Sequence, residues 1–286
     1  MPKHAHLLSP AWKDLVRQWL LEDIPSFDRG GFVVGEAERT ALLWGKTDGV
    51  LAGVPFFEEI FRILDCSVEW LLDEGEAFSA VKKVAVVRGK ARNILMGERT
   101  ALDVLSRASG IASRARRLVR LACEKGWQGR VAATRKTTPG FRLVEKYAVV
   151  VGGADTHRMD LSAMTMLKDN HVVSAGSISE AVRQAKIVGG FSVKVEVECS
   201  SLQQAVEAAS AGADIVMLDN FSASDFAQPA KELKSKYPHL LVEMSGGITE
   251  ENIESYFSPY VDVISLGSLT QGVPAIDFSL KIQPPS

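Results

Sequence analysis

Charged and polar residues recur directly after short apolar stretches in the second half of the chain. Six such stretches cover residues 131–134, 164–167, 193–197, 215–218, 240–244 and 261–266. The residues that follow them are Arg135 and Lys136, Lys168, Glu198, Asp219 and Asn220, Ser245 to Gly247, and Gly267 and Ser268. Cations bind carboxylates and phosphates, while carboxylates bind hydroxyl groups and Mg²⁺. This set of residues predicts a site for an anionic, phosphate-bearing substrate.

Cations form the largest part of this candidate site. They are Arg135, Lys136, His157, Arg158 and Lys168. The chain as a whole has 33 Lys and Arg against 35 Asp and Glu, for a net charge of −2. A protein so near neutrality has no bulk attraction for nucleic acid or an acidic membrane. Any anion site must therefore be a local cluster.

Two carboxylates and a group of small residues complete the set. Glu198 and Asp219 end adjacent predicted strands and suit ribose hydroxyls and Mg²⁺, which would be held mainly through substrate and water. Backbone N–H groups for a phosphate are expected from Ser245, Gly246, Gly247, Gly267 and Ser268. Glu250 and Glu251 follow directly and would repel a phosphate at the next helix end. We therefore expect the phosphate to contact the loop.

The elements that position these residues alternate between strands and helices. Helical stretches are predicted at 177–188, 201–211, 223–236 and 249–257, between the apolar stretches. Such alternation predicts a parallel sheet, and this number of units favours an incomplete (β/α) barrel. The carboxyl ends of barrel strands share one face, so residues from 135 to 268 should converge on one pocket. Motifs for a dinucleotide fold, a zinc protease, a serine hydrolase and a P-loop are missing from the sequence.

The first part of the chain predicts a mixed α/β domain. Helices are expected at 11–21, at 56–64 after Pro55, and from 98 to about 125. Strands are expected at 40–44 and 50–53, joined by a hairpin turn at 47–49, and at 81–88 and 91–96. We place an N-terminal domain at 1–104 and a barrel domain at 105–274. The stretch 276–282 alternates apolar and polar residues, so segment 275–286 is a candidate strand for return to the N-terminal domain.

Several residues leave alternatives open. The arginine face at 107–120 suits either RNA or an acidic partner, or a solvated or interface face, and no aromatic residues interleave with it for stacking. Lys194 and Glu196 share a strand face with Glu198 and suit an ion pair or a substrate contact. His171 and Asn170 fit either a supporting or a structural role.

Composition sets the expected environment. The chain has 286 residues, 46% of them hydrophobic and 24% charged, which are ordinary globular values. Its three cysteines are scattered and match no metal or disulfide pattern, which favours a reducing compartment. The sequence has no secretory signal pattern and no spanning segment. We expect a cytoplasmic protein, with the nucleus also open, and no nucleic-acid or membrane partner.

Seven motifs resemble the quinolinate phosphoribosyltransferase family over essentially the whole chain. They lie at 97–102, 134–142, 153–158, 167–171, 194–198, 218–220 and 245–247. The resemblance implies an N-terminal α/β sandwich domain and an incomplete α/β barrel. It also implies phosphoribosyl transfer from phosphoribosyl pyrophosphate to quinolinate with decarboxylation. The products would be nicotinate mononucleotide, pyrophosphate and CO₂, with Mg²⁺ as the cofactor, in de novo NAD biosynthesis.

The resemblance also implies roles for individual residues. The two quinolinate carboxylates would be held by Arg135, His157, Arg158 and Lys168. Lys136 and Lys168 would face the pyrophosphate and 5-phosphate, Glu198 and Asp219 the ribose and Mg²⁺, and these four are the expected catalytic residues. The 5-phosphate would lie on Ser245, Gly246, Gly247, Gly267 and Ser268. The donor-binding loop with paired acids, known from other phosphoribosyltransferases, is missing, as it is in this family.

The resemblance further implies a shared site between subunits. Arg99 would reach into a neighbouring subunit's site, so the protein would be a dimer or larger oligomer. The alternatives are a related phosphoribosyltransferase with another acidic acceptor, and a non-enzymatic protein that binds RNA through the arginine face.

Overall fold

The computed structural model describes residues 4–284, so the outermost residues of the predicted domain ends, 1–3 and 285–286, lie outside the described chain. The chain divides into two compact units. One comprises the described residues up to Arg116, together with Thr137–Gly153 and the segment from Gly272 onward. The other comprises Arg117–Lys136 and Ala154–Gln271. We call them the sandwich unit and the barrel unit.

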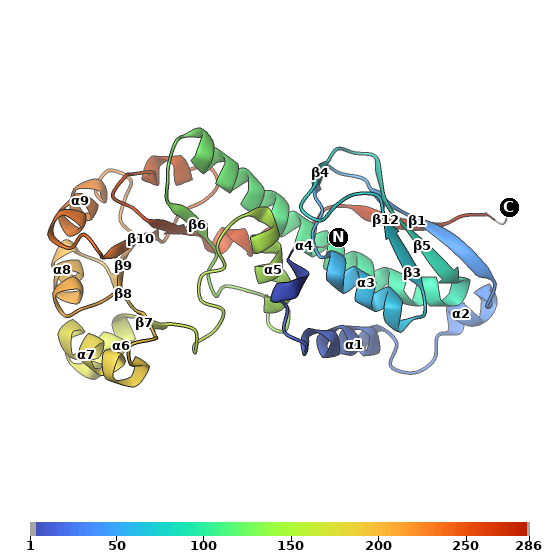
Figure 1. Ribbon diagram of the computed structural model, residues 1–286, viewed down its shortest axis with the longest axis horizontal. Helices are drawn as coiled ribbons and strands as arrows, with labels where there is room; N and C mark the ends of the chain where they lie inside the picture. Colours follow the sequence, from blue (N-terminus) through green and yellow to red (C-terminus); the bar gives the residue numbers. More distant parts are fainter. Residues whose placement is uncertain (1–3, 285–286) are drawn as a thin grey trace. The chain divides into compact units, whose positions relative to one another are not determined.

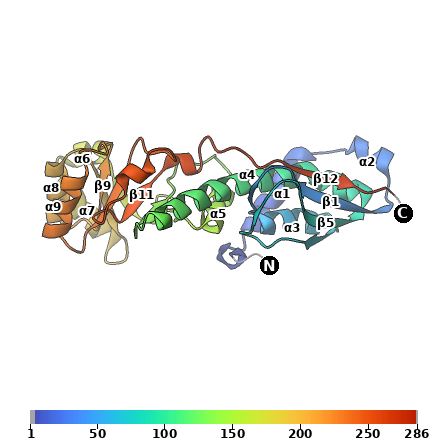
Figure 2. The ribbon, with the colours of Figure 1, turned by 90° about the horizontal axis from the view of Figure 1, so that it is seen from above.

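The sandwich unit is built on an antiparallel sheet with strand order β12-β1-β5-β3. Its strands are β1 (Glu38–Gly45), β3 (Ser67–Trp70), β5 (Lys82–Lys90) and β12 (Phe278–Ile282). A small second sheet pairs β2 (Gly49–Val50) with β4 (Ala77–Phe78). The helical elements are η1 (Ala5–Leu7), α1 (Trp12–Asp23), α2 (Arg29–Val34), α3 (Val54–Ile63) and α5 (Arg142–Gly152). Figure 2 shows β12, from the chain's end, lying beside β1.

The predicted hairpin at 47–49 is wrong. β1 pairs with β5 and β12, whereas β2 pairs with β4. The residues of the expected turn make distant contacts: the Asp48 carboxylate accepts a hydrogen bond from the amide of Ala80, and the Thr47 hydroxyl accepts one from the amide of Asp277. Long-range pairing has therefore overridden a local turn pattern.

The predicted strand at 91–96 is also wrong, because these residues begin the long helix α4 (Ala91–Glu124). Ala91 and Ile94 are both buried, and their three-residue spacing suits one helix face. The helix predicted at 249–257 is reduced to the 3₁₀ turn η2 (Ile253–Tyr256). There the Asn252 side chain accepts a hydrogen bond from the amide of Thr249, which favours a turn over a longer helix.

An aromatic cluster forms the core of the sandwich unit. Phe56 of α3 is fully buried, and its ring lies 5.3 Å from that of Trp12, 6.1 Å from that of Trp19 and 5.4 Å from that of Tyr147. Pro55 occupies the first turn of α3, where a missing N–H costs nothing. One buried ring thus joins α1, α3 and α5.

The barrel unit contains a six-stranded parallel sheet with strand order β6-β11-β10-β9-β8-β7. The strands are β6 (Arg130–Ala132), β7 (Thr165–Leu167), β8 (Val195–Cys199), β9 (Ile215–Asp219), β10 (Leu241–Ser245) and β11 (Val263–Ser265). The last strand pairs with the first, and Ala132 forms a further parallel bridge to Asp155. Within residues 4–284 the edge strands β6 and β7 do not pair with each other, so the sheet stays open between them. The predicted fold class, an N-terminal sandwich with an incomplete barrel, is confirmed.

Helices cover the outer side of the parallel strands, as Figure 1 shows. They are α6 (Asp169–Ala175), α7 (Ile178–Gly189), α8 (Leu202–Ser210) and α9 (Ala227–Lys236), and the 3₁₀ turn η3 (Gly267–Leu269) follows β11. At the amino ends of the strands, Asp262 accepts hydrogen bonds from the Val242 amide and from Lys234. This aspartate ties β10 in place at the end opposite its polar carboxyl terminus.

The arginine face is paired within the protein. Arg107 forms an ion pair of 2.8 Å with the buried Glu145, and Arg117 forms one of 2.6 Å with Glu250. Arg116 donates to the carbonyl oxygens of Val151 and Gly152. These partners favour a structural role for the face over RNA binding. Among residues 4–284, the helices lack the combination of length and apolar character required to span a membrane.

Replacing Phe56 with alanine should destabilise the sandwich unit. Removing a fully buried phenylalanine leaves a cavity and costs about 3–5 kcal/mol of unfolding free energy. The matched control is Phe32→Ala, because the Phe32 ring is 90% exposed and its loss should cost less than about 0.5 kcal/mol. Urea denaturation of both variants measures the difference. Equal losses would contradict the proposed core.

Candidate active site

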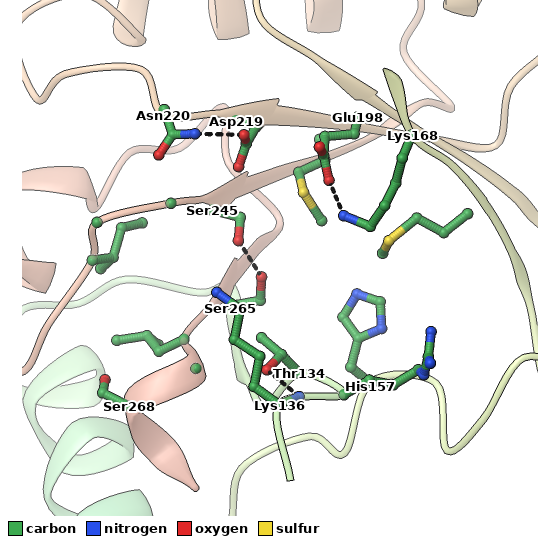
Figure 3. Close-up of a pocket in the computed structure, with 18 of the residues that line it drawn as sticks. Thr134, Lys136, His157, Lys168, Glu198, Asp219, Asn220, Ser245, Ser265 and Ser268 are labelled. Atoms are coloured by element: carbon green, nitrogen blue, oxygen red, sulfur yellow. Dashed lines mark hydrogen bonds and ion pairs between the residues drawn. The ribbon is translucent and has the colours of Figure 1, made fainter. Parts of the chain in front are cut away.

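A cavity of about 580 Å³ lies at the carboxyl ends of the barrel strands. All the predicted site residues except Arg99 line it: Arg135, Lys136, His157, Arg158, Lys168, Glu198, Asp219, Ser245, Gly246, Gly247, Gly267 and Ser268. Because the six strands are parallel, their polar termini meet at one edge, as the sequence predicted. Figure 3 shows side chains from several strands pointing into this space.

Two guanidinium groups lie on one side of the cavity. Burial, and then the nearby Arg135 cation, lower the pKa of Arg158, while Glu196 opposes the shift. The Arg158 guanidinium donates to the carbonyl oxygen of Met164 at 3.2 Å and to the sulfur of Met166 at 3.5 Å. The repulsion between two such positive charges decreases when an anion binds between them. This side of the cavity is therefore suited to carboxylates.

His157 lines the cavity but turns both ring nitrogens toward the protein. Nδ1 accepts a hydrogen bond of 2.7 Å from the amide of Arg158. Nε2 lies 3.1 Å from a carboxylate oxygen of Glu243 and 3.6 Å from one of Glu196. Its predicted role as a direct carboxylate ligand stays a prediction.

The opposite side of the cavity carries the two predicted carboxylates. Lys168 of the β7 end forms an ion pair with Glu198 of β8, drawn in Figure 3. Burial and the neighbouring Glu198 raise the pKa of Asp219, while Lys168 and Lys136 oppose the rise. The side-chain amide of Asn220 donates a hydrogen bond of 2.6 Å to Asp219. Adjacent parallel strands therefore place two acids side by side and surround them with cations.

Small residues form the floor of the cavity. Gly246 and Gly247 have φ angles of 89° and 64°, which favour glycine. A Cβ on Gly246 would lie 2.8 Å from the backbone nitrogen of Asn220, whereas one on Gly247 would meet nothing within 4 Å. The Ser265 hydroxyl donates to that of Ser245 at 3.0 Å. The loop leaves backbone and hydroxyl groups free of bulky side chains, as a bound phosphate requires.

Two polar residues of this region, Ser265 and Glu243, were not predicted from the sequence, and Glu196 was predicted only as an ion-pair partner or a substrate contact. Ser265 lines the cavity, while Glu196 and Glu243 lie fully or almost fully buried beside His157. A glutamate inside an otherwise apolar strand was the available signal, in 195–199 and in 241–245. Burial and the neighbouring Glu243 raise the pKa of Glu196, with Arg158 and Lys168 opposing.

Other candidates lie elsewhere. Arg99 lines a separate cavity of about 550 Å³ in the sandwich unit and forms an ion pair with Asp103. Lys194 lines a third cavity beside Tyr237, so the suggested ion pair with Glu196 is not formed in the described chain. The Nδ1 atom of His171 accepts a hydrogen bond from the amide of Lys168 at the start of α6.

Two sets of residues offer donor atoms that could hold a metal ion. In residues 4–284, one group of three potential ligand side chains lies close together: His157, Glu196 and Glu243. The Arg158 amide donates to Nδ1, which places the imidazole proton on Nε2, so this nitrogen cannot ligate a cation. Glu198 and Asp219 fit Mg²⁺ better, because they are hard oxygen donors that face an open cavity.

A barrel that gathers guanidinium groups, carboxylates and glycine amides around one cavity defines an α/β enzyme for phosphorylated anionic substrates. Family comparison narrows this class. The quinolinate phosphoribosyl transferase N-terminal domain matches residues 27–109, and the corresponding C-terminal domain matches residues 111–281. The chain belongs to the quinolinate phosphoribosyltransferase family, which confirms the resemblance.

Individual relatives agree with this assignment. Nicotinate-nucleotide pyrophosphorylase (carboxylating) of Rattus norvegicus is 54% identical over 277 residues, or 96% of this chain and 93% of the relative. The Homo sapiens relative of the same name is 54% identical over 268 residues, or 94% and 90%. The solved nicotinate-nucleotide pyrophosphorylase from Francisella tularensis is 35% identical with a TM-score of 0.89, over 96% of this chain and 98% of that one.

The floor of the cavity should tolerate alanine at one glycine better than at the other. Gly247→Ala should cost about 1–2 kcal/mol of unfolding free energy from its positive φ alone. Gly246→Ala adds a clash with Asn220 and should cost at least about 1 kcal/mol more. Urea denaturation of the pair checks this. A Gly246→Ala variant as stable as Gly247→Ala would contradict the close approach.

Proposed function

We propose that this chain is a quinolinate phosphoribosyltransferase of de novo NAD biosynthesis. It transfers the phosphoribosyl group of phosphoribosyl pyrophosphate to the ring nitrogen of quinolinate and releases pyrophosphate and CO₂ to give nicotinate mononucleotide. One observation carries the proposal: paired guanidinium groups, paired carboxylates and a glycine floor surround a single cavity. Full-length relatives bear the name of this activity.

The acceptor is selected by the cationic side. Arg135 and Arg158 have the charge and the planar geometry to bind two neighbouring carboxylates, with Lys168 as a third cation. Met166 and Met217 supply apolar lining beside which a flat ring can lie. An acceptor with a single carboxylate offers these half-buried cations one anionic partner fewer. A dicarboxylate pyridine therefore suits this pocket better than nicotinate.

The donor is held across the floor. Its 5-phosphate contacts the loop at Ser245–Gly247 and the turn at Gly267, and its ribose hydroxyls contact Glu198 and Asp219. As the C1–O bond to pyrophosphate breaks, positive charge develops on the ribose, and the two carboxylates stabilise it. Lys136 and Lys168 offset the negative charge of the departing pyrophosphate. The bond from the ring nitrogen to C1 forms with the electron pair of that nitrogen.

Decarboxylation follows from the new charge on the ring. Once its nitrogen is bonded to C1 it is cationic and accepts the electron pair left when the adjacent carboxylate departs as CO₂. The carbon atom then takes up a proton. Arg135 and Arg158 hold the acceptor in place, so the protein's contribution is positioning and electrostatics, without a covalent nucleophile.

Mg²⁺ is the proposed cofactor, with Glu198 and Asp219 as its ligands, mainly through substrate and water. When bound, it supplies positive charge to the pyrophosphate leaving group. Burial and then the neighbouring Glu198 raise the pKa of Asp219, and this supports the assignment because a divalent cation compensates such a pair of acids.

Assembly and location are further parts of the proposal. Arg99 lies outside the barrel cavity and is 66% exposed, which leaves it available to a second subunit. We therefore propose a dimer or larger oligomer with a shared site. Three free cysteines are compatible with a cytoplasmic location, with the nucleus also open.

The assay is formation of nicotinate mononucleotide from quinolinate and phosphoribosyl pyrophosphate, with and without Mg²⁺. We expect activity with quinolinate, little with nicotinate, and none after removal of Mg²⁺ by a chelator. Arg158→Met should raise the KM for quinolinate about 10–100-fold, because a charge-assisted hydrogen bond contributes about 1.5–3 kcal/mol. The KM for the donor should change little. Faster turnover of nicotinate than of quinolinate would favour the related transferase with another acceptor.

The shared site predicts complementation between subunits. Arg99→Ala and Lys168→Ala should each be nearly inactive alone, since one lacks the contributed arginine and the other a pocket cation. Mixed under conditions that allow exchange, they should regain activity through hybrid oligomers that hold one intact site. Mass spectrometry of differently labelled subunits shows whether exchange occurs. Exchange without recovery would refute a shared site.

A further inference from the structure

Two buried glutamates lie deep in the barrel without enough partners for their oxygens. Glu196 of β8 is fully buried, and Glu243 of β10 is 2% exposed. Within the described residues, both oxygens of Glu196 and Oε1 of Glu243 have no hydrogen-bond partner. Burying such groups costs several kcal/mol in general, so their presence calls for a functional explanation. Among residues 4–284, the hydrogen bond of the Glu243 carboxylate is with His157, at 3.1 Å.

The hydrogen bonds of His157 fix the direction of this contact. The Arg158 amide donates to Nδ1, so Nδ1 carries no proton and the neutral ring carries it on Nε2. That N–H donates to Oε2 of Glu243. Oxygen Oε2 of Glu196 lies further away, at 3.6 Å. The imidazole therefore links the carboxylate of β10 to the backbone of Arg158.

The segment that carries His157 needs such a link. It follows Asp155, which forms an isolated parallel bridge to Ala132 of β6, and it precedes β7, an edge strand of the sheet. His157 has a φ of 55°, a conformation that is unfavourable for a non-glycine residue and persists only when its surroundings enforce it. The hydrogen bond from Nε2 to Glu243 helps to hold His157 in this conformation.

We infer that Glu243 is a positioning residue that acts through His157 to hold Arg158 in the acceptor site. The carboxylate fixes the ring, the ring fixes the amide of Arg158, and the guanidinium reaches its contacts with Met164 and Met166. This inference deepens the proposed function and rests on it for the identity of the acceptor. Glu243 therefore contributes to the affinity for the pyridine dicarboxylate and does not contact the ribosyl donor.

Glu243→Leu tests the inference, with Glu243→Gln as the conservative variant. Leucine removes the acceptor for Nε2–H, whereas the glutamine carbonyl keeps it. In the leucine variant, the Kd for quinolinate, measured by calorimetry without donor, should rise about tenfold, and so should its KM. The donor KM should stay within about twofold, and Glu243→Gln should restore most of the affinity. Glu243→Leu removes a buried carboxyl group but leaves the Nε2–H of His157 without its acceptor, so its melting temperature is measured to show that it is folded.

His157→Phe provides a second path to the same result. It keeps a ring but loses both nitrogen contacts, so it should weaken quinolinate binding to a similar extent. The double variant should be no weaker than either single variant, since both changes break one chain of contacts. If Glu243→Leu does not fold, the comparison of His157→Phe with Glu243→Gln decides the question.

Asp262→Ala is the matched control for damage to β10. It removes a hydrogen bond and an ion pair at the opposite end of the same strand, so it should lower the melting temperature and leave the Kd for quinolinate unchanged. The inference is overturned if folded Glu243→Leu binds quinolinate like the parent, or if leucine and glutamine weaken both substrates alike. A parent protein that neither binds nor converts quinolinate would instead overturn the proposed function.

Discussion

The whole site depends on like charges being held together in one cavity before any substrate arrives. Burial and then Arg135 lower the pKa of Arg158, and burial and then Glu198 raise that of Asp219, so a ligand of opposite charge lowers the free energy of each pair. Only a rigid frame can hold such pairs. The parallel strands supply it, because their carboxyl ends have a fixed spacing and direction. A substrate that carries negative groups and develops positive charge during the reaction then pairs with the guanidinium groups and with the carboxylates at the same time.

Much of this site could be predicted from the sequence because its residues lie next to apolar stretches that can be recognised locally. A polar residue directly after an apolar stretch marks a strand end, and parallel topology brings strand ends together. That reasoning found twelve cavity residues scattered between Arg135 and Ser268. Glu243 escaped it because the residue lies within the strand, two positions before the end. Which way His157 turns its nitrogens also could not be predicted, since its partners come from β8 and β10.

The fold was predicted well where periodicity is strong and poorly where distant pairing decides. The strands of the barrel unit were each found to within a few residues. By contrast, residues 47–49 are of types that are common in turns, yet each pairs with a residue distant in the sequence. The partner of Thr47 is Asp277, that of Asp48 is Ala80, and that of Gly49 is Phe78. Residues 91–96 contain enough apolar residues for a strand or a helix. Their burial on one helical face settles the choice, and only the packed structure contains that information.

The position of β12 has a consequence for how the protein is made. This strand forms one edge of the antiparallel sheet by pairing with β1, although Phe278 lies 233 residues after its partner Gly45 in the sequence. A ribosome delivers β1 early and β12 last. During synthesis β1 therefore lacks a neighbour on that side until the segment that contains β12 has been made, and an open strand edge favours pairing with other chains. For the same reason, the N-terminal sheet cannot be completed by any fragment that stops at the end of the barrel.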